Sequence, residues 1–184
     1  MNVIITGGSG FIGSFAVKRF IKENHRVLNI DKLTYAGNNN RLLSVRNKKN
    51  YKFLKKDILD RSIVKVLNHF KPDVIINFAA ETHVDNSING PKAFVETNII
   101  GTFNLLECAR KYNTKRFHHI STDEVYGQLG KTGKFKSTTA YNPQNPYSAT
   151  KASSDFLVRS YGHTFGLNYT LSNCSNNYGP RQNE

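Results

Sequence analysis

The chain has 184 residues, a hydrophobic content of 38% and a formal net charge of +13. This length suits one domain with a buried core and is too short for two domains of ordinary size. No apolar run approaches the ~20 residues that span a membrane, and the strand-like N-terminus has no basic flank, so a cytoplasmic protein is predicted. Cys108 and Cys174 have no metal-type spacing, which predicts free thiols and no metal site.

The excess of positive charge is the unusual feature of the composition. Nucleic-acid binding is one interpretation of such a charge. However, the Lys and Arg residues are dispersed, and no nucleic-acid-binding motif accompanies the densest cluster, between Arg46 and Lys56. A solvated Lys-rich surface is therefore favoured over a nucleic-acid partner. The positive field could still attract an anionic small molecule.

The first predicted unit is a strand, a glycine-rich turn and a helix in immediate succession. The β-branched run Val3–Ile5 precedes Gly7, Gly10 and Gly13, and apolar residues at helical spacing begin at Phe15. Glycines at this spacing let the backbone approach a pyrophosphate, and the N-terminus of the helix offers free N–H groups. A tight turn without a ligand is the alternative, but the context of the glycines predicts a dinucleotide site.

The second predicted strand, Arg26–Ile30, ends at Asp31. A ribose-binding acid is expected about twenty residues after the glycines, which is where Asp31 stands. A carboxylate there accepts hydrogen bonds from a ribose diol and repels a 2′-phosphate, which favours NAD over NADP. The neighbouring Lys32 weakens this preference slightly. The turn-rich loop at 34–40 is expected to wrap the adenosine end of the cofactor.

The rest of the chain alternates between strands and helices. Strands are predicted at 51–54, 74–78, 116–120 and 168–172, and helices at 61–70, at about 91–112 and from Pro146 onward. This alternation predicts a doubly wound α/β fold with a parallel sheet. Within the second helix, Asn98 and Thr102 are polar positions that are expected to face the sheet.

The most informative stretch is Ser121–Gly127, which follows the predicted strand 116–120. It carries the adjacent acids Asp123 and Glu124 at the carboxyl end of a strand, where ligands bind in open α/β sheets. Taken alone, the stretch could equally be a solvated polar turn. In the loop after strand 74–78, His83 could be a catalytic base, although a structural hydrogen-bonding role is favoured.

The helix that begins at Pro146 carries a candidate proton-transfer pair. Tyr147 and Lys151 stand at positions i and i+4, on one face of the helix. Such a pair is common by chance, but here it follows a nucleotide-binding turn and an acidic loop. The charge of Lys151 would favour the phenolate of Tyr147 and shift the pKa of Tyr147 towards neutrality.

Together these motifs resemble those of the extended short-chain dehydrogenases/reductases, and more narrowly those of nucleotide-sugar 4,6-dehydratases of the dTDP-glucose type. The resemblance covers essentially the whole chain, and the motifs that carry it are Thr6–Gly13, Asp31–Asn38, Asn77–Asp85, Ser121–Gly127, Tyr147–Lys151 and Asn176–Pro180. The Asp123–Glu124 pair separates this group from related sugar-nucleotide epimerases and decarboxylases.

The resemblance implies a Rossmann-type fold and an NAD-dependent, redox-neutral loss of water from dTDP-glucose or UDP-glucose. Tyr147, assisted by Thr122 and Lys151, would take the proton of the 4-hydroxyl as hydride passes from C4 to NAD. Glu124 would remove the C5 proton, and Asp123 would protonate the departing 6-hydroxyl. Hydride would then return to C6 as a proton returns to C5.

The resemblance also implies the binding residues and a homodimer through a helix pair that includes the helix of Tyr147. The implied NAD-binding residues are Gly7, Gly10, Phe11, Ile12, Gly13, Asp31, Lys32, Thr34, Gly37, Asp57, Ile58, Ala79, Ala80, Thr97, Tyr147, Lys151 and Cys174. The implied substrate-binding residues are Thr82, Thr122, Asp123, Glu124, Tyr147 and Asn176.

Residues 1–184 are thus expected to form an NAD-binding domain that carries the catalytic residues, with the family's C-terminal substrate domain largely absent. Two rival interpretations stay open. One is a nucleotide-sugar 4-epimerase of the same fold, which the Asp123–Glu124 pair disfavours. The other is a non-catalytic NAD-binding protein that senses the cofactor or pairs with a partner.

Overall fold

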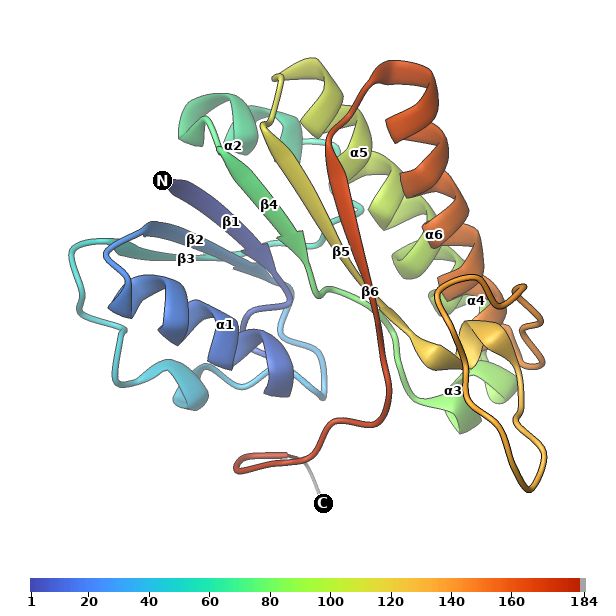
Figure 1. The fold of residues 1–184 in the computed structure, drawn as a ribbon. Helices are drawn as coiled ribbons and strands as arrows, with labels where there is room; N and C mark the ends of the chain where they lie inside the picture. Colours follow the sequence, from blue (N-terminus) through green and yellow to red (C-terminus); the bar gives the residue numbers. More distant parts are fainter. Residues whose placement is uncertain (183–184) are drawn as a thin grey trace.

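The computed structural model describes residues 1–182, which form a six-stranded sheet in the order β3-β2-β1-β4-β5-β6 (Figure 1). Every neighbouring pair of strands is parallel. The strands are β1 (Asn2–Thr6), β2 (Arg26–Asp31), β3 (Tyr51–Lys55), β4 (Val74–Asn77), β5 (Arg116–Thr122) and β6 (Tyr169–Cys174). This order reverses between β1 and β4, so the predicted doubly wound fold is confirmed.

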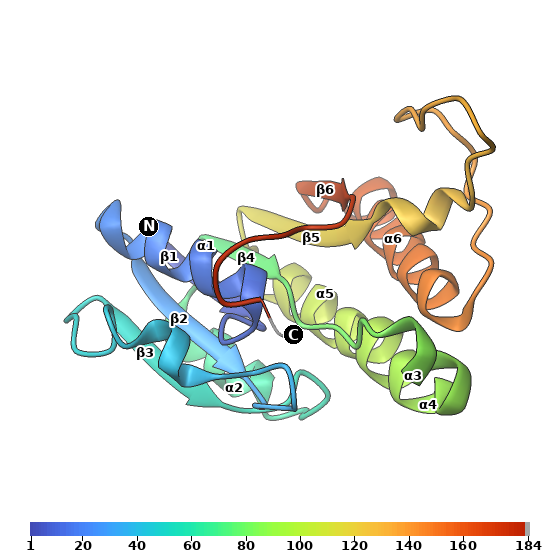
Figure 2. The same cartoon turned by 90° about the horizontal axis from the view of Figure 1, so that it is seen from below.

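Helices cover both faces of the sheet (Figures 1 and 2). On one face lies α1 (Phe11–Lys22), and on the other lie α2 (Ile63–Phe70), α5 (Thr102–Lys111) and α6 (Pro146–Phe165). Each face has its own apolar core. In β1, Val3 and Ile5 pack under α1, whereas Ile4 packs under α2 and α5. A strand buried on both faces needs this continuous apolar run, since successive side chains point to opposite sides.

The helix predicted at about 91–112 differs in detail from the observed segment. The chain forms α3 (Val84–Asn89), α4 (Pro91–Phe94), a π-helical stretch η2 (Val95–Gly101) and then α5. Asn98 and Thr102 are both buried, which confirms that they face inward. The π-helical stretch places Asn98 beneath the loop after β4, where its amide pairs with the backbone of Glu81 at 2.9 and 3.0 Å.

Two short 3₁₀ turns and the segment after β6 lie beside the main helices and strands. A 3₁₀ turn, η1 (Asn39–Leu42), follows the loop after β2, and a second, η3 (Asp123–Tyr126), follows β5. The segment after β6 crosses the carboxyl ends of the strands towards α1 (Figure 2), where Arg41 and Arg181 bond each other's backbone carbonyls. No helix within residues 1–182 is long and apolar enough to cross a membrane.

Candidate active site

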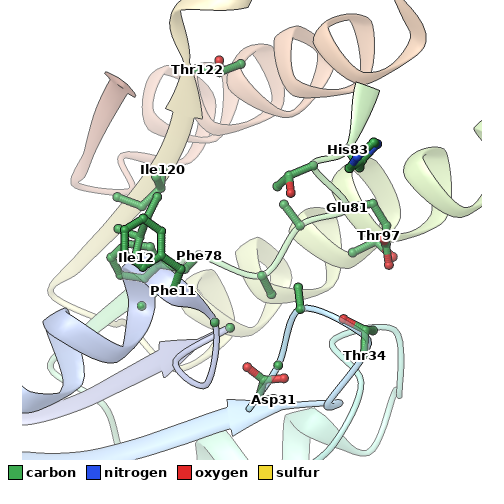
Figure 3. A pocket seen from close by; sticks show the side chains of 18 of the residues that line it. Phe11, Ile12, Asp31, Thr34, Phe78, Glu81, His83, Thr97, Ile120 and Thr122 are labelled. Atoms are coloured by element: carbon green, nitrogen blue, oxygen red, sulfur yellow. The ribbon is translucent and has the colours of Figure 1, made fainter. Parts of the chain in front are cut away.

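A cleft of about 900 Å³ opens at the carboxyl ends of the strands, where the strand order reverses. Figure 3 shows Asp31 and Thr34 at one end of this cleft and Thr122 at the other. All of the residues predicted to bind the cofactor, from Gly7 to Cys174, line it. Of the predicted substrate residues, Asp123 alone lies outside it and lines an adjoining cavity of about 530 Å³ instead.

The glycine turn after β1 has no space for side chains at two of its positions. Gly7 has φ +68°, and a Cβ on it would lie 2.7 Å from the backbone nitrogen of Ala79. A Cβ on Gly13 would overlap the Gly7 carbonyl. The turn therefore depends on glycine, and it delivers the first turn of α1 to the cleft with no side-chain cap and no acidic residue. Free N–H groups in this position suit an anion such as a pyrophosphate.

The carboxylate of Asp31 is buried at the end of β2 and organises the loops around it. Its Oδ2 accepts a hydrogen bond from the backbone N–H of Ser9 at 2.9 Å, and its Oδ1 accepts one from that of Leu33 at 2.8 Å. Each carboxylate oxygen has a further lone pair, so both can still accept from a ribose diol. The donor and acceptor chemistry at this end of the cleft fits NAD.

Lys32 lies between two carboxylates within the same cleft. Its Nζ lies 3.6 Å from Asp57 Oδ2, 3.4 Å from Glu81 Oε1 and 3.4 Å from the hydroxyl of Thr97. Two carboxylates thus balance its charge, and it is not a free cation for a 2′-phosphate. The preference for NAD over NADP that Asp31 predicts is therefore not weakened by Lys32.

The acidic pair lies directly beyond β5. Thr122 caps η3 by accepting a hydrogen bond from the N–H of Glu124 at 3.2 Å, and its hydroxyl lies 3.5 Å from Asp123 Oδ1. The Thr122 side chain also lies near the phenol of Tyr147, where it favours a lower pKa of that phenol. The two carboxylates have different surroundings, because Glu124 lines both cavities and Asp123 lines only the smaller one.

Tyr147 and Lys151 lie buried on the same face of α6. However, the predicted shift of the pKa of Tyr147 towards neutrality is wrong. Burial raises the pKa of Tyr147 to about 12, the carboxylates of Glu124, Asp123 and Asp155 also raise it, and the nearby Thr122 side chain only partly opposes this. Lys151 directs its Nζ to the Ile120 carbonyl at 2.6 Å. The groups of this chain thus keep Tyr147 protonated at neutral pH.

The loop after β4 and the end of β6 complete the cleft. Thr82 and His83 line it and are exposed, and the role of the His83 ring stays a prediction. Cys174 ends β6 beside Lys151, and Asn176 lines both cavities. Their ligand contacts stay a prediction.

Comparison with known proteins assigns this chain to a family. The model of the GDP-mannose 4,6 dehydratase family matches residues 4–184. The chain belongs to this family. A dTDP-glucose 4,6-dehydratase of Xanthomonas campestris is 51% identical over 187 residues, which cover 96% of this chain and 53% of the relative. The corresponding enzyme of Salmonella typhimurium is 50% identical, and the match covers 98% of this chain and 55% of that one.

Solved structures of a 4,6-dehydratase and of a 4-epimerase are both similar to this chain. The dTDP-glucose 4,6-dehydratase DesIV of Streptomyces venezuelae, with NAD and TYD bound, is 40% identical with a TM-score of 0.93, over 99% of this chain and 58% of that one. The UDP-glucose 4-epimerase of Thermus thermophilus, in complex with NAD, is 30% identical with a TM-score of 0.92, over 100% of this chain and 58% of that one. The chain spans about half the length of the curated relatives it matches.

In this member of the 4,6-dehydratase family, one buried carboxyl group is not among the predicted site residues. Asp155 is fully buried one turn after Lys151, and its Oδ2 accepts hydrogen bonds from Ser121 Oγ at 2.8 Å and Tyr141 OH at 2.9 Å. Burial raises the pKa of Asp155, while Ser121 and the charge of Lys151 oppose the rise. Its i+4 spacing from Lys151 was the available signal, but nothing in the sequence indicates that Ser121 and Tyr141 converge on it.

Lys151 should make the stability of this dehydratase-family chain depend on pH. Burial lowers the pKa of Lys151 from 10.5 to about 8, and Asp155 and Cys174 oppose the shift. Between these pKa values the unfolded chain binds more protons than the folded chain, so this group adds stability as the pH rises from 8 towards 10.5. Relative to Lys151→Met, the parent's free energy of unfolding should rise by about 2 kcal/mol between about pH 7.5 and 9.5 in urea titrations. Equal pH dependence in the two proteins would contradict this expectation.

Proposed function

We propose that this chain carries the NAD site and the catalytic residues for 4,6-dehydration of a nucleoside-diphosphate glucose, dTDP- or UDP-glucose. One observation carries the proposal: Glu124 opens onto the same cleft as the glycine turn, Tyr147 and Lys151. The 51% identity to a dTDP-glucose 4,6-dehydratase supports it. The likeness to 4-epimerases supports a second candidate, which would need the glycine turn and Tyr147 but not the acidic pair.

The cofactor assignment is supported by the fit of the cleft. The uncapped N-terminus of α1 would hold the pyrophosphate, and Asp31 would accept hydrogen bonds from the adenosine ribose. Ala79 and Ala80, which line the cleft after β4, would let the cofactor pass close to the backbone. When bound, NAD would accept a hydride from the sugar and later return it, which makes the overall reaction redox-neutral.

The side chains divide the proton transfers among themselves. Tyr147 would take the proton of the 4-hydroxyl, and the nearby side chain of Thr122 would orient the phenol. Lys151 would supply the positive charge that makes this transfer feasible, because burial and three carboxylates hold the proton on Tyr147. Glu124 would remove the proton at C5, which the 4-keto group acidifies. Asp123 would donate a proton to the 6-hydroxyl, which leaves as water.

The experiment is incubation of the purified chain with NAD and either dTDP-glucose or UDP-glucose. Dehydration yields a 4-keto-6-deoxy sugar, which develops an absorbance in alkali, whereas epimerisation yields the 4-epimer and no such absorbance. Calorimetry measures NAD binding in parallel. Binding of NAD without either product would support the non-catalytic alternative and contradict the proposal.

The chain is proposed to form a homodimer through the helices on one side of the sheet. Large apolar side chains on η2, α5 and α6 (Val95, Ile100, Phe103 and Phe156) are each at least 41% exposed. A second copy would bury this face symmetrically. Light scattering should give about twice the 20.8 kDa of one chain. Phe103→Glu should reduce the mass to that of a monomer, while Leu43→Glu, an exposed apolar position elsewhere, should not.

A cytoplasmic location is proposed as well. Cys108 is buried, Cys174 is half-buried, and neither forms a disulfide. Free thiols are the usual state in a reducing compartment. Tagging of the chain and fractionation of the cell would test this location, and recovery outside the cytoplasm would contradict it.

A further inference from the structure

Asn145 stands between the helix that carries Tyr147 and the loop that carries Glu124. It is the N-cap of α6, with an extended backbone (φ −140°, ψ 165°), immediately before Pro146. Its side-chain oxygen accepts the backbone N–H of Ser148 at 2.7 Å, and Ser148 Oγ accepts the N–H of Asn145 at 3.2 Å. This reciprocal arrangement is a capping box, which fixes the rotamer of Asn145.

The other end of the same amide is directed to Glu124. Its Nδ2 donates to Glu124 Oε2 at 3.2 Å. The two partners decide the orientation of the amide, because a backbone N–H can only donate and an ionised carboxylate can only accept. Asn145 therefore holds the first turn of α6 with its oxygen and one oxygen of Glu124 with its nitrogen.

Glu124 is thereby held at two points. Its backbone N–H donates to Thr122 Oγ1 at 3.2 Å, and its Oε2 is held by Asn145. Within residues 1–182, no hydrogen bond is found to the remaining oxygen, Oε1. Two titratable groups lie near this carboxylate, Asp123 on its own turn and Tyr147 on α6, and Lys151 lines the same cleft. A carboxylate fixed through one oxygen can present the other to a substrate in a constant position.

We propose that Asn145 is a positioning residue for Glu124: its amide binds one carboxylate oxygen and leaves the other to accept the proton from the sugar carbon. This inference rests on the proposed function, in which Glu124 is the base. It adds a residue that acts through Glu124 and does not itself touch the reacting atoms. The proton passes from the sugar carbon to Glu124 Oε1, and Asn145 neither takes up nor gives up a proton.

Two substitutions separate this role from helix capping. Asn145→Ser and Asn145→Asp both keep a good N-cap, but neither offers an amide donor to Glu124. Both variants should therefore fold like the parent, as judged by circular dichroism and thermal unfolding. Their kcat should fall by about 10- to 100-fold with little change in KM, because the base is displaced while binding contacts remain. In Asn145→Asp, a second carboxylate beside Glu124 should also move the acidic limb of the pH–rate profile upward.

A second measurement does not depend on turnover. In ¹⁵N-labelled chain, the side-chain NH₂ signals of Asn145 should shift with pH as Glu124 titrates. Glu124→Gln should abolish this shift, because the amide cannot titrate, whereas Asp123→Asn should preserve it. Spectra recorded with and without NAD would show whether the contact persists in the loaded site.

The outcomes distinguish this inference from the proposed function. Full turnover in Asn145→Ser and Asn145→Asp would overturn the inference and leave the dehydratase function intact. A parent chain that makes no product would overturn the proposed function, and the NMR titration would then decide the contact alone. If the pH dependence of the Asn145 NH₂ signals were the same in Glu124→Gln as in the parent, the inference would be overturned in either case.

Discussion

Replacement of Glu124 by Gln should lower turnover by about 10²- to 10⁴-fold, the usual contribution of a positioned general base. The variant keeps the size of the side chain. Its amide oxygen can accept the hydrogen bond that Asn145 now donates to Oε2 at 3.2 Å, and the backbone bond to Thr122 is unaffected. Only the ability to take a proton is lost, so the fold and the affinity for NAD should stay as in the parent.

The measurement is the rate of formation of the alkali-developed 4-keto product under saturating substrate. Glu96→Gln is the matched control, because it removes an exposed carboxylate on η2, away from the cleft. That control should retain the parental rate. Turnover of Glu124→Gln within a few-fold of the parent would remove Glu124 from the mechanism, whatever the reaction proves to be.

The second large effect is expected on stability. Replacement of Asp155 by Ala should lower the free energy of unfolding by about 3–5 kcal/mol, a large part of the roughly 5–15 kcal/mol of a typical domain. The substitution leaves the buried hydroxyl of Ser121 without its acceptor and removes the acceptor of Tyr141. It also removes the carboxylate whose charge compensates the buried Lys151. An uncompensated buried charge is the costliest of these consequences.

Urea titration measures this effect, and three variants divide it into parts. Ser121→Ala and Tyr141→Phe each remove one donor to Asp155 and should cost about 1 kcal/mol. Asp155→Asn keeps an acceptor oxygen but not the charge, so its stability should fall between the parent and the Ala variant. A loss below 1 kcal/mol for Asp155→Ala would show that Asp155 does not compensate the charge of Lys151.

The elements of the fold were predictable because their signals are local. The apolar run of β1, the glycines after it and Asp31 at the end of β2 each depend on neighbours within one strand–turn–helix unit. The predicted fold, with its alternating strands and helices, is confirmed. The π-helical stretch from Val95 to Gly101 was not predictable, since it arises where the helix accommodates Asn98 beneath the Glu81 loop.

The candidate site also has a part that the sequence predicts and a part that it does not predict. The carboxyl ends of parallel strands meet at one edge, so residues placed there by the sequence gather in one cleft regardless of side-chain detail. The neutralisation of Lys32 by Asp57 and Glu81, in contrast, joins the ends of β2 and β3 to the loop after β4. No spacing in the sequence indicates that these three side chains meet.

The sequence by itself therefore determined the glycine turn, Asp31 at the end of β2, the acidic pair and the Tyr147–Lys151 pair, because each is set by residue type and short-range spacing. The tertiary structure alone decided how these groups are protonated and oriented. Burial and surrounding carboxylates hold the proton on Tyr147, Asp155 compensates Lys151, and Asn145 reaches from the cap of α6 to Glu124. Solvent exclusion and long-range contacts set these properties, and both exist only after the helices have packed on the sheet.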